Sequence, residues 1–224
     1  MSTFLKVGHR GAKAYETENT LESFTKAIEL GANAIELDVR TSGDGELILI
    51  HDDNLKRVFG SDVPVKGVTL NELKELTGNR IATLDEALRY IGRKVEKILV
   101  ELKEVGYEDK VIETVRKMNL TDRVILLSFH EESLARARDL DRTIETGLVY
   151  TKLKKPLDAA LRLNAQYIVP LYRFVHAAKV TKAHKKGLKV IVWTINTENE
   201  ARTYRAKDVD GIATDKPDIL KGII

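Results

Sequence analysis

Residues 34–53 of the chain read AIELDVRTSGDGELILIHDD, and two acids interrupt the apolar run at their start. Glu36 and Asp38 stand two positions apart. In an extended strand they therefore share one face, while the apolar residues between and beside them occupy the other. The spacing predicts a strand over 35–39 with one apolar face and one face that carries two carboxylates.

The second half of the same stretch predicts a hairpin. The glycine-rich segment TSGDGE (41–46) is typical of a turn, and an apolar run, LILI, follows it. If 35–39 and 46–50 pair as antiparallel arms, the chain returns along the first strand and brings His51 close to Asp38. A histidine and two carboxylates are therefore expected at one end of the fold.

Outward from this stretch, short β-branched runs alternate with amphipathic segments along the whole chain. The expected strands are 4–8, 34–39, 97–102, 124–129, 145–150, 166–171, 189–194 and 211–214. The expected helices are 20–31, 83–92, 107–119, 130–140, 156–164, 174–187, 197–206 and 218–223. Near-continuous apolar strands of this kind are typical of a parallel sheet covered by helices. Eight alternating pairs predict a (β/α)₈ TIM barrel, with a doubly wound open sheet as the alternative.

One segment, between strand two and its helix, breaks this alternation. A length of 224 residues suits one large domain or two small ones. We expect a single TIM-barrel domain over residues 1–224, with a small insertion at about 41–80. The insertion is expected to form a cap over the carboxyl ends of the strands, here called the mouth of the barrel. Barrel enzymes place their chemistry at that end.

Composition narrows the classes of partner. The 37 Lys and Arg residues nearly balance the 34 Asp and Glu residues, and the net charge is +3. No basic run is interleaved with aromatic residues, so nucleic acid is not an expected partner. The absence of cysteine excludes disulfides and thiolate metal sites. No apolar run approaches membrane length, and the first residues lack the pattern of a signal peptide. We expect a cytoplasmic protein without stable membrane insertion, either monomer or dimer.

Acidic side chains on two neighbouring predicted strands form a candidate metal site. Glu101 ends the strand KILVEL, and Lys103 lies on the same face. Glu36 and Asp38 come from the preceding barrel strand. In a barrel these carboxylates converge on one end, and such oxygen ligands suit a hard divalent cation, Mg²⁺ or Ca²⁺. The alternative is that the acids only form ion pairs with Lys103 and Arg10.

Two histidines are candidates for acid–base catalysis. His9 and Arg10 lie in GHRG, at the end of the first predicted strand, and His51 closes the hairpin. Two imidazoles that face a bound phosphate can serve as general acid and general base, and an arginine can pair with the phosphate through two parallel hydrogen bonds. The single tryptophan, Trp193, ends another strand and is expected to form an apolar wall of the pocket.

These motifs, taken in order, resemble those of the glycerophosphodiester phosphodiesterase family. They are GHRG (8–11), ENT (18–20), IELDV (35–39), IHD (50–52), VELK (100–103), VWTIN (192–196) and DGIATDKP (210–217). They span nearly the whole chain, and the segment after IHD is similar to the small capping insertion of that family.

The resemblance implies a metal-dependent hydrolase that converts glycerophosphodiesters, such as glycerophosphocholine or glycerophosphoethanolamine, into an alcohol and sn-glycerol 3-phosphate. It assigns His9 and His51 to acid–base catalysis. One divalent cation, Mg²⁺, Ca²⁺ or Mn²⁺, is assigned to Glu36, Asp38 and Glu101. The phosphate is assigned to Arg10 and Lys103, and Trp193 is expected to line the pocket. Glu18 is expected near the site, without an assigned role.

Three other functions remain open from the sequence. The nearest is a lysophospholipase-D-like or lyase activity on lysolipids with the same site. Another is a non-catalytic binder of phosphate esters, which predicts that a histidine or metal carboxylate is missing, and none is. A metal-free isomerase or aldolase with Lys103 as nucleophile would leave the cluster of three acids unexplained, and full activity after EDTA treatment would favour it.

Overall fold

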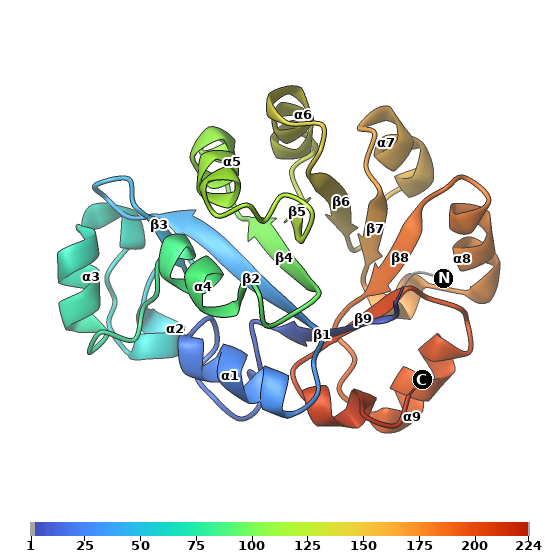
Figure 1. Cartoon of the computed structure of the whole chain (residues 1–224), viewed down its shortest axis with the longest axis horizontal. Helices are drawn as coiled ribbons and strands as arrows, with labels where there is room; N and C mark the ends of the chain where they lie inside the picture. Colours follow the sequence, from blue (N-terminus) through green and yellow to red (C-terminus); the bar gives the residue numbers. More distant parts are fainter. Residues whose placement is uncertain (1–2, 224) are drawn as a thin grey trace.

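The computed structural model describes residues 3–223, and within this range one sheet of nine strands surrounds the core (Figure 1). The strands are β1 (Leu5–His9), β2 (Ala34–Thr41), β3 (Leu47–Leu49), β4 (Lys97–Leu102), β5 (Val124–Ser128), β6 (Glu145–Tyr150), β7 (Tyr167–Pro170), β8 (Lys189–Val192) and β9 (Gly211–Thr214). All of them except β3 pair in parallel, and β1 pairs with both β2 and β9, which closes the sheet. The predicted (β/α)₈ barrel is confirmed, and the open-sheet alternative is wrong.

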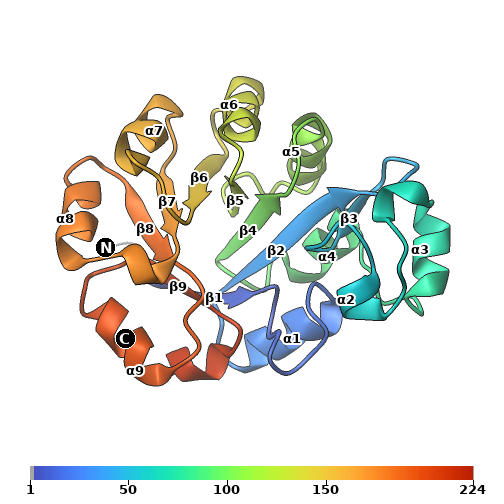
Figure 2. The same cartoon turned by 180° about the vertical axis from the view of Figure 1, so that it is seen from behind.

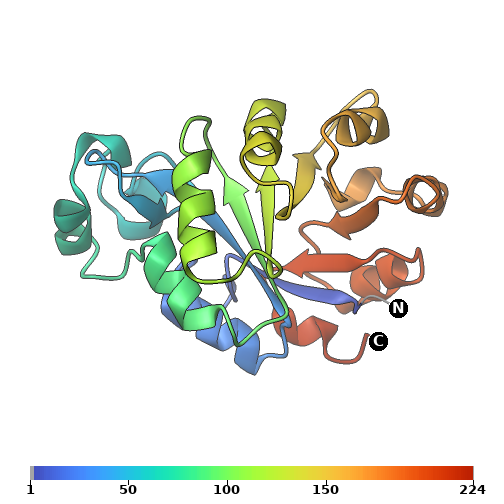
Figure 3. The ribbon, with the colours of Figure 1, turned by 45° about the horizontal axis from the view of Figure 1, so that its top comes forward.

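Helices follow the strands around the outside of the barrel (Figures 1 and 3). They are α1 (Leu21–Glu29), α4 (Leu84–Ile91), α5 (Glu108–Lys117), α6 (Glu131–Leu140), α7 (Pro156–Arg162), α8 (Ala177–His184) and α9 (Glu198–Arg205). No helix within residues 3–223 is long and apolar enough to cross a membrane. The helix expected over 218–223 is instead a short 3₁₀ turn, η3 (Pro217–Leu220), a geometry that short segments commonly adopt.

Side-chain alternation along β2 explains the two layers of the core. Ile35, Leu37 and Val39 are fully buried and point outward, where they pack in one apolar cluster with residues of α1, α4 and α5. A second apolar cluster fills the inside of the barrel and includes Leu99 of β4 and Ile191 of β8. Glu36 and Asp38 take the inward positions of β2, so the fold directs them into the barrel.

The predicted hairpin is present. β3 runs antiparallel to β2, with Val39 opposite Leu49 and Thr41 opposite Leu47. The backbone N–H of Ile50 then donates to the carbonyl of Asp38 over 3.1 Å. His51 follows directly and lies at the mouth, as the hairpin predicted.

The remainder of the insertion forms short helices that were not among the expected elements. They are α2 (Lys56–Phe59), η1 (Val65–Gly67), another short 3₁₀ turn, and α3 (Leu70–Leu76). Their apolar side chains form a small cluster of their own, in which Ile48 and Ile50 of the hairpin join Leu55, Val65 and Leu73. The segment lies beyond β3, at one side of the barrel (Figures 1 and 2).

Candidate functional site

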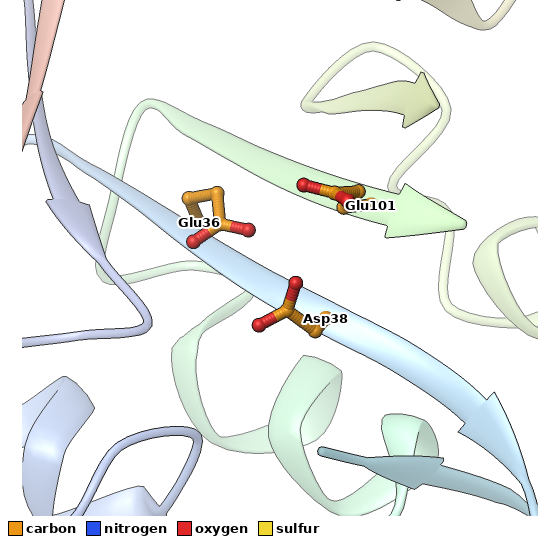
Figure 4. Close-up of side chains that lie close together, drawn as sticks. All are labelled: Glu36, Asp38 and Glu101. Atoms are coloured by element: carbon orange, nitrogen blue, oxygen red, sulfur yellow. The ribbon is translucent and has the colours of Figure 1, made fainter. Parts of the chain in front are cut away.

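Three carboxylates converge at the mouth on two adjacent strands (Figure 4). Parallel pairing of β2 and β4 sets Asp38 directly opposite Glu101, and Glu36 lies one inward position earlier on β2. One oxygen from each of the three groups lies within 4.8 Å of the others. The structure therefore brings together the acids that the sequence predicted as a metal site.

Burial and mutual repulsion make this cluster unfavourable for isolated carboxylates. Burial, together with the charges of Asp38 and Glu101, raises the pKa of Glu36 well above its ordinary value. Burial and Asp38 likewise raise the pKa of Glu101, although Lys103 opposes that rise. For Asp38, burial is outweighed by Arg10 and by Lys103, so that its pKa falls to about 2. Burial and repulsion therefore disfavour three ionised carboxylates at this place unless a further cation joins them.

Basic side chains offset part of the negative charge of the three acids, as the ion-pair alternative predicts. Lys103 Nζ lies 2.5 Å from Glu101 Oε1 and 3.4 Å from Asp38 Oδ1. Arg10 Nε lies 3.0 Å from Asp38 Oδ2. Two cations face three acids, however, and among the described residues nothing donates a hydrogen bond to the buried Oε1 of Glu36 or Oδ1 of Asp38. Buried oxygens of this kind fit the ligands of a hard divalent cation.

A sharp turn after β1 orients His9 and Arg10. The backbone N–H of Arg10 donates to Glu36 Oε2 over 2.8 Å, and Arg10 itself has a φ of 55°. Gly11 has a φ of +85°, and a Cβ at this position would lie 2.6 Å from the backbone carbon of Ser23. Only glycine accommodates both the left-handed backbone and the close approach of α1.

His9 is held by an acid from the far end of the chain. Its Nδ1 lies 2.7 Å from Oδ1 of Asp215, the residue that follows β9. Burial would raise the pKa of Asp215, but the bond to His9 and a further bond from Asn196 lower it to about 2. An ionised carboxylate can only accept, so Nδ1 carries the proton and Nε2 remains for a substrate. Burial lowers the pKa of His9, against the opposing effect of Asp215.

His51 has the same arrangement with a different partner. Its Nδ1 donates to Oδ1 of the neighbouring Asp52 over 2.6 Å, and its carbonyl accepts from Arg40 Nε over 2.9 Å. Burial lowers the pKa of His51, while Asp38 and Asp52 oppose that effect. Both predicted histidines therefore reach the mouth with Nδ1 engaged by an aspartate.

Residues of the ENT motif fix the groups beside them. Glu18, left without a role by the sequence, is buried and accepts from Arg10 Nη1 over 2.9 Å. Asn19 donates from Nδ2 to Asp38 Oδ2 over 2.9 Å, and its Oδ1 accepts from the backbone of Asp38. Thr20 caps α1. The motif therefore orients an arginine and an acid of the cluster.

The pocket above the carboxylates is small, with an apolar wall. Its volume is about 110 Å³, and its lining includes His9, Arg10, His51, Glu101, Lys103, Phe129 and Trp193. Trp193 follows β8, donates from Nε1 to the carbonyl of Val169 over 2.8 Å, and meets Phe129 edge to face at 5.7 Å. The predicted tryptophan wall is present, and Phe129 extends it.

Sequence reasoning assigned no role to four residues that the structure places at this site: Asn19, Asp52, Asp215 and Phe129. A detectable clue to Asp215 was its position in DKP, directly after the last strand, because a polar residue there must lie at the mouth. Asn19 stands in the ENT motif (18–20), but the sequence assigned it no role. Nothing in the sequence distinguished Phe129 from a core aromatic.

Comparison with known proteins supports the family that the motifs predicted, over nearly the whole chain. The profile of the "Glycerophosphoryl diester phosphodiesterase family" matches residues 9–219. The chain is 34% identical to a glycerophosphodiester phosphodiesterase of Caldanaerobacter subterraneus, across 98% of this chain and 97% of that protein.

Two solved structures are similar as well. A glycerophosphodiester phosphodiesterase from Thermotoga maritima has 33% identity and a TM-score of 0.85, with 98% of each chain covered. A phosphodiesterase from Oleispira antarctica, solved in complex with the product sn-glycerol-3-phosphate, has 26% identity and a TM-score of 0.86. That match covers 97% of this chain and 95% of the other.

Proposed function

Because the chain belongs to the glycerophosphoryl diester phosphodiesterase family and is a phosphoric diester hydrolase, we propose that it cleaves small glycerophosphodiesters. The substrates are glycerophosphocholine, glycerophosphoethanolamine or close analogues, and the products are an alcohol and sn-glycerol 3-phosphate. The observation that carries this proposal is the meeting of two aspartate-bound histidines, an arginine and three carboxylates around one small pocket.

One divalent cation, Mg²⁺, Ca²⁺ or Mn²⁺, would be held by Glu36, Asp38 and Glu101. Their carboxylate oxygens provide the hard ligands that these ions prefer. When bound, the cation supplies positive charge that stabilises the phosphoryl oxygens during the reaction.

Arg10 and Lys103 are assigned to the phosphate. Both line the pocket, and both already lie beside the carboxylates that would hold the cation. A guanidinium can present two parallel donors to a phosphate, whereas the ammonium of Lys103 acts as a compact charge. Trp193, with Phe129, would contact the part of the substrate that lies away from the phosphate.

His9 and His51 are assigned to proton transfer at Nε2. One of them accepts the proton of the attacking oxygen, which belongs to water or to the neighbouring hydroxyl of the glycerol. The other donates a proton to the departing alkoxide as the P–O bond breaks. An attack by the glycerol hydroxyl would give a cyclic phosphodiester, which water then opens by the reverse use of the same pair.

Replacement of Asp215 by asparagine is expected to lower kcat about 100-fold with little change in KM. The amide cannot accept equally from His9 Nδ1 and from Asn196, so the preferred tautomer of His9 is lost. Steady-state kinetics measure the effect. Asp218→Asn is the matched control, because Asp218 lies on the same segment and its side chain accepts only a surface hydrogen bond, from Tyr15, within the described chain. A kcat within twofold of wild type for Asp215→Asn would remove Asp215 from the mechanism.

The substrate assignment is tested by comparing glycerophosphocholine with lysophosphatidylcholine under identical conditions. We expect kcat/KM to be at least about tenfold higher for glycerophosphocholine, because the pocket is smaller than the roughly 300–1,000 Å³ of pockets that enclose larger ligands. Coupled detection of sn-glycerol 3-phosphate and release of choline give the two rates. Preference for the lysolipid would favour the lysophospholipase-D-like alternative. No product release from either substrate would favour a binding protein.

Three further assignments stay predictions. They are a single catalytic domain over residues 1–224 with a cap at about 41–80, a cytoplasmic location, and a monomeric or dimeric state.

A further inference from the structure

Arg57, on α2 of the insertion, makes an unusual set of contacts for a half-exposed side chain. Its Nη1 and Nη2 donate to the two carboxylate oxygens of Glu18 over 2.8 and 2.7 Å. Its Nε donates to Asp52 Oδ2 over 2.6 Å. A single planar guanidinium therefore joins two acids that lie 34 positions apart in the chain (52 minus 18).

Each of these acids also holds a residue of the proposed mechanism. Glu18 Oε1 accepts from Arg10 Nη1 over 2.9 Å, and Arg10 is assigned to the phosphate. Asp52 Oδ1 accepts from His51 Nδ1 over 2.6 Å, and His51 is assigned to proton transfer. Arg57 thus lies directly behind both groups, and it touches neither of them in the hydrogen-bond network.

Burial distinguishes Arg57 from an ordinary surface ion pair. The side chain of Glu18 is only 6% exposed, so its charge needs close partners, and Arg10 and Arg57 share that role. The adjacent residue of α2, Lys56, provides the contrast. It pairs with Asp62 at 3.0 Å, but both side chains are more than two-thirds exposed, where ion pairs contribute little.

We propose that Arg57 is a positioning residue: through Glu18 and Asp52 it holds Arg10 and His51 in one relative orientation. The inference rests on the proposed function and extends it to the insertion, which thereby completes the active site. A lysine at this position would supply the charge but could not bridge both acids with a planar fork.

A second set of contacts links the insertion to the backbone of His51. Lys66 Nζ, from η1, lies 2.8 Å from Glu104 Oε2 in the loop after β4. Glu104 Oε1 accepts from Arg40 Nη1 over 2.6 Å, and Arg40 Nε donates to the carbonyl of His51. The insertion thus reaches the side chain of His51 from Arg57 through Asp52, and its backbone carbonyl from Lys66 through Glu104 and Arg40.

The test measures kcat and KM for glycerophosphocholine in Arg57→Gln, Arg57→Lys and the matched control Lys56→Gln. We expect kcat to fall about 10–100-fold in Arg57→Gln, to fall less in Arg57→Lys, and to stay at the wild-type value in Lys56→Gln. Thermal unfolding of each variant shows that the measured protein is folded. If Arg57→Gln does not fold, the comparison of Arg57→Lys with Lys56→Gln decides.

Two readouts separate positioning from a structural role. In an Asp52→Asn background, Arg57→Gln should cost less than in the wild type, because the contact through Asp52 is already weakened. Guanidinium ions at low millimolar concentration should restore part of the activity of Arg57→Ala, because the site is half-exposed and open to a small cation. Additive effects and no rescue would indicate a structural role and overturn the proposal.

The outcomes also distinguish this inference from the proposed function. An inactive wild type would overturn the proposed function, and the positioning role with it. An active wild type whose kcat survives in Arg57→Gln within twofold would overturn the positioning role alone.

Discussion

Replacement of His9 by alanine is expected to lower kcat for glycerophosphocholine by about 10²–10⁴-fold, the usual contribution of a positioned general acid or base. His9 is buried at the mouth, its Nδ1 is engaged by Asp215, and its Nε2 lies 4.0 Å from Glu36 Oε2 of the carboxylate cluster. Within the described residues, the other histidine that lines the pocket is His51, so a comparable loss is expected for His51→Ala.

A double variant that combines His9→Ala with His51→Ala tests whether the two histidines act together. Because the two histidines act in the same proton-transfer sequence, losing both should cost much less than the product of the two single losses. Single-turnover and steady-state release of sn-glycerol 3-phosphate measure the three variants. His130→Ala is the control, because His130 is exposed at the start of α6 and does not line the pocket. Loss of less than tenfold in His9→Ala would contradict the acid–base assignment.

Replacement of Glu101 by glutamine is expected to weaken Mn²⁺ binding by at least about 100-fold and to reduce activity to a similar or greater extent. The change removes one of three converging carboxylates and leaves Lys103 opposite a smaller negative charge. Glu101 is preferred to Asp38 for this test, because Asp38 also holds Asn19 and Arg10, whose orientation would change with it.

Binding is measured directly by calorimetry or by electron paramagnetic resonance of Mn²⁺, independently of activity. The ion should also raise the melting temperature of the wild type and leave that of Glu101→Gln unchanged, because only a binding-competent native state is stabilised. Glu96→Gln, an exposed position just before β4 at the opposite end of the barrel, is the matched control.

Removal of divalent cations by chelation tests the same metal assignment through activity. EDTA should abolish the activity of the wild type, and added Mg²⁺, Ca²⁺ or Mn²⁺ should restore it to different extents, which identifies the working ion. Full activity after chelation, together with unchanged Mn²⁺ binding in Glu101→Gln, would instead support metal-free chemistry at Lys103.

Much of this site was predictable because strand periodicity fixes where side chains point. The two-residue spacing of Glu36 and Asp38 placed both inside the barrel, and parallel pairing then set Asp38 opposite Glu101. The turn TSGDGE predicted the return of His51. Each inference needed only local geometry and the rule that strand ends meet at one mouth.

The insertion was less predictable. Helix α2 is four residues long, too short for a periodic apolar pattern to appear, whereas α3 begins with a capping box of Thr69 and Glu72 that was overlooked. Their stability comes from packing against the hairpin, through the cluster that includes Ile48 and Leu73. Short helices of this kind depend on tertiary contacts more than on local preference.

The sequence by itself determined the barrel, the carboxylate cluster and the position of both histidines, because period-two alternation and chain order are local properties. Only the tertiary structure decided which partner orients each group. His9 is held by Asp215, 206 positions away, and Arg10 shares Glu18 with Arg57 of the insertion. Arg10, Glu18 and Asp215 lie in loops, whose backbones follow no repeat, so these side chains meet their partners only when the closed sheet brings the segments together.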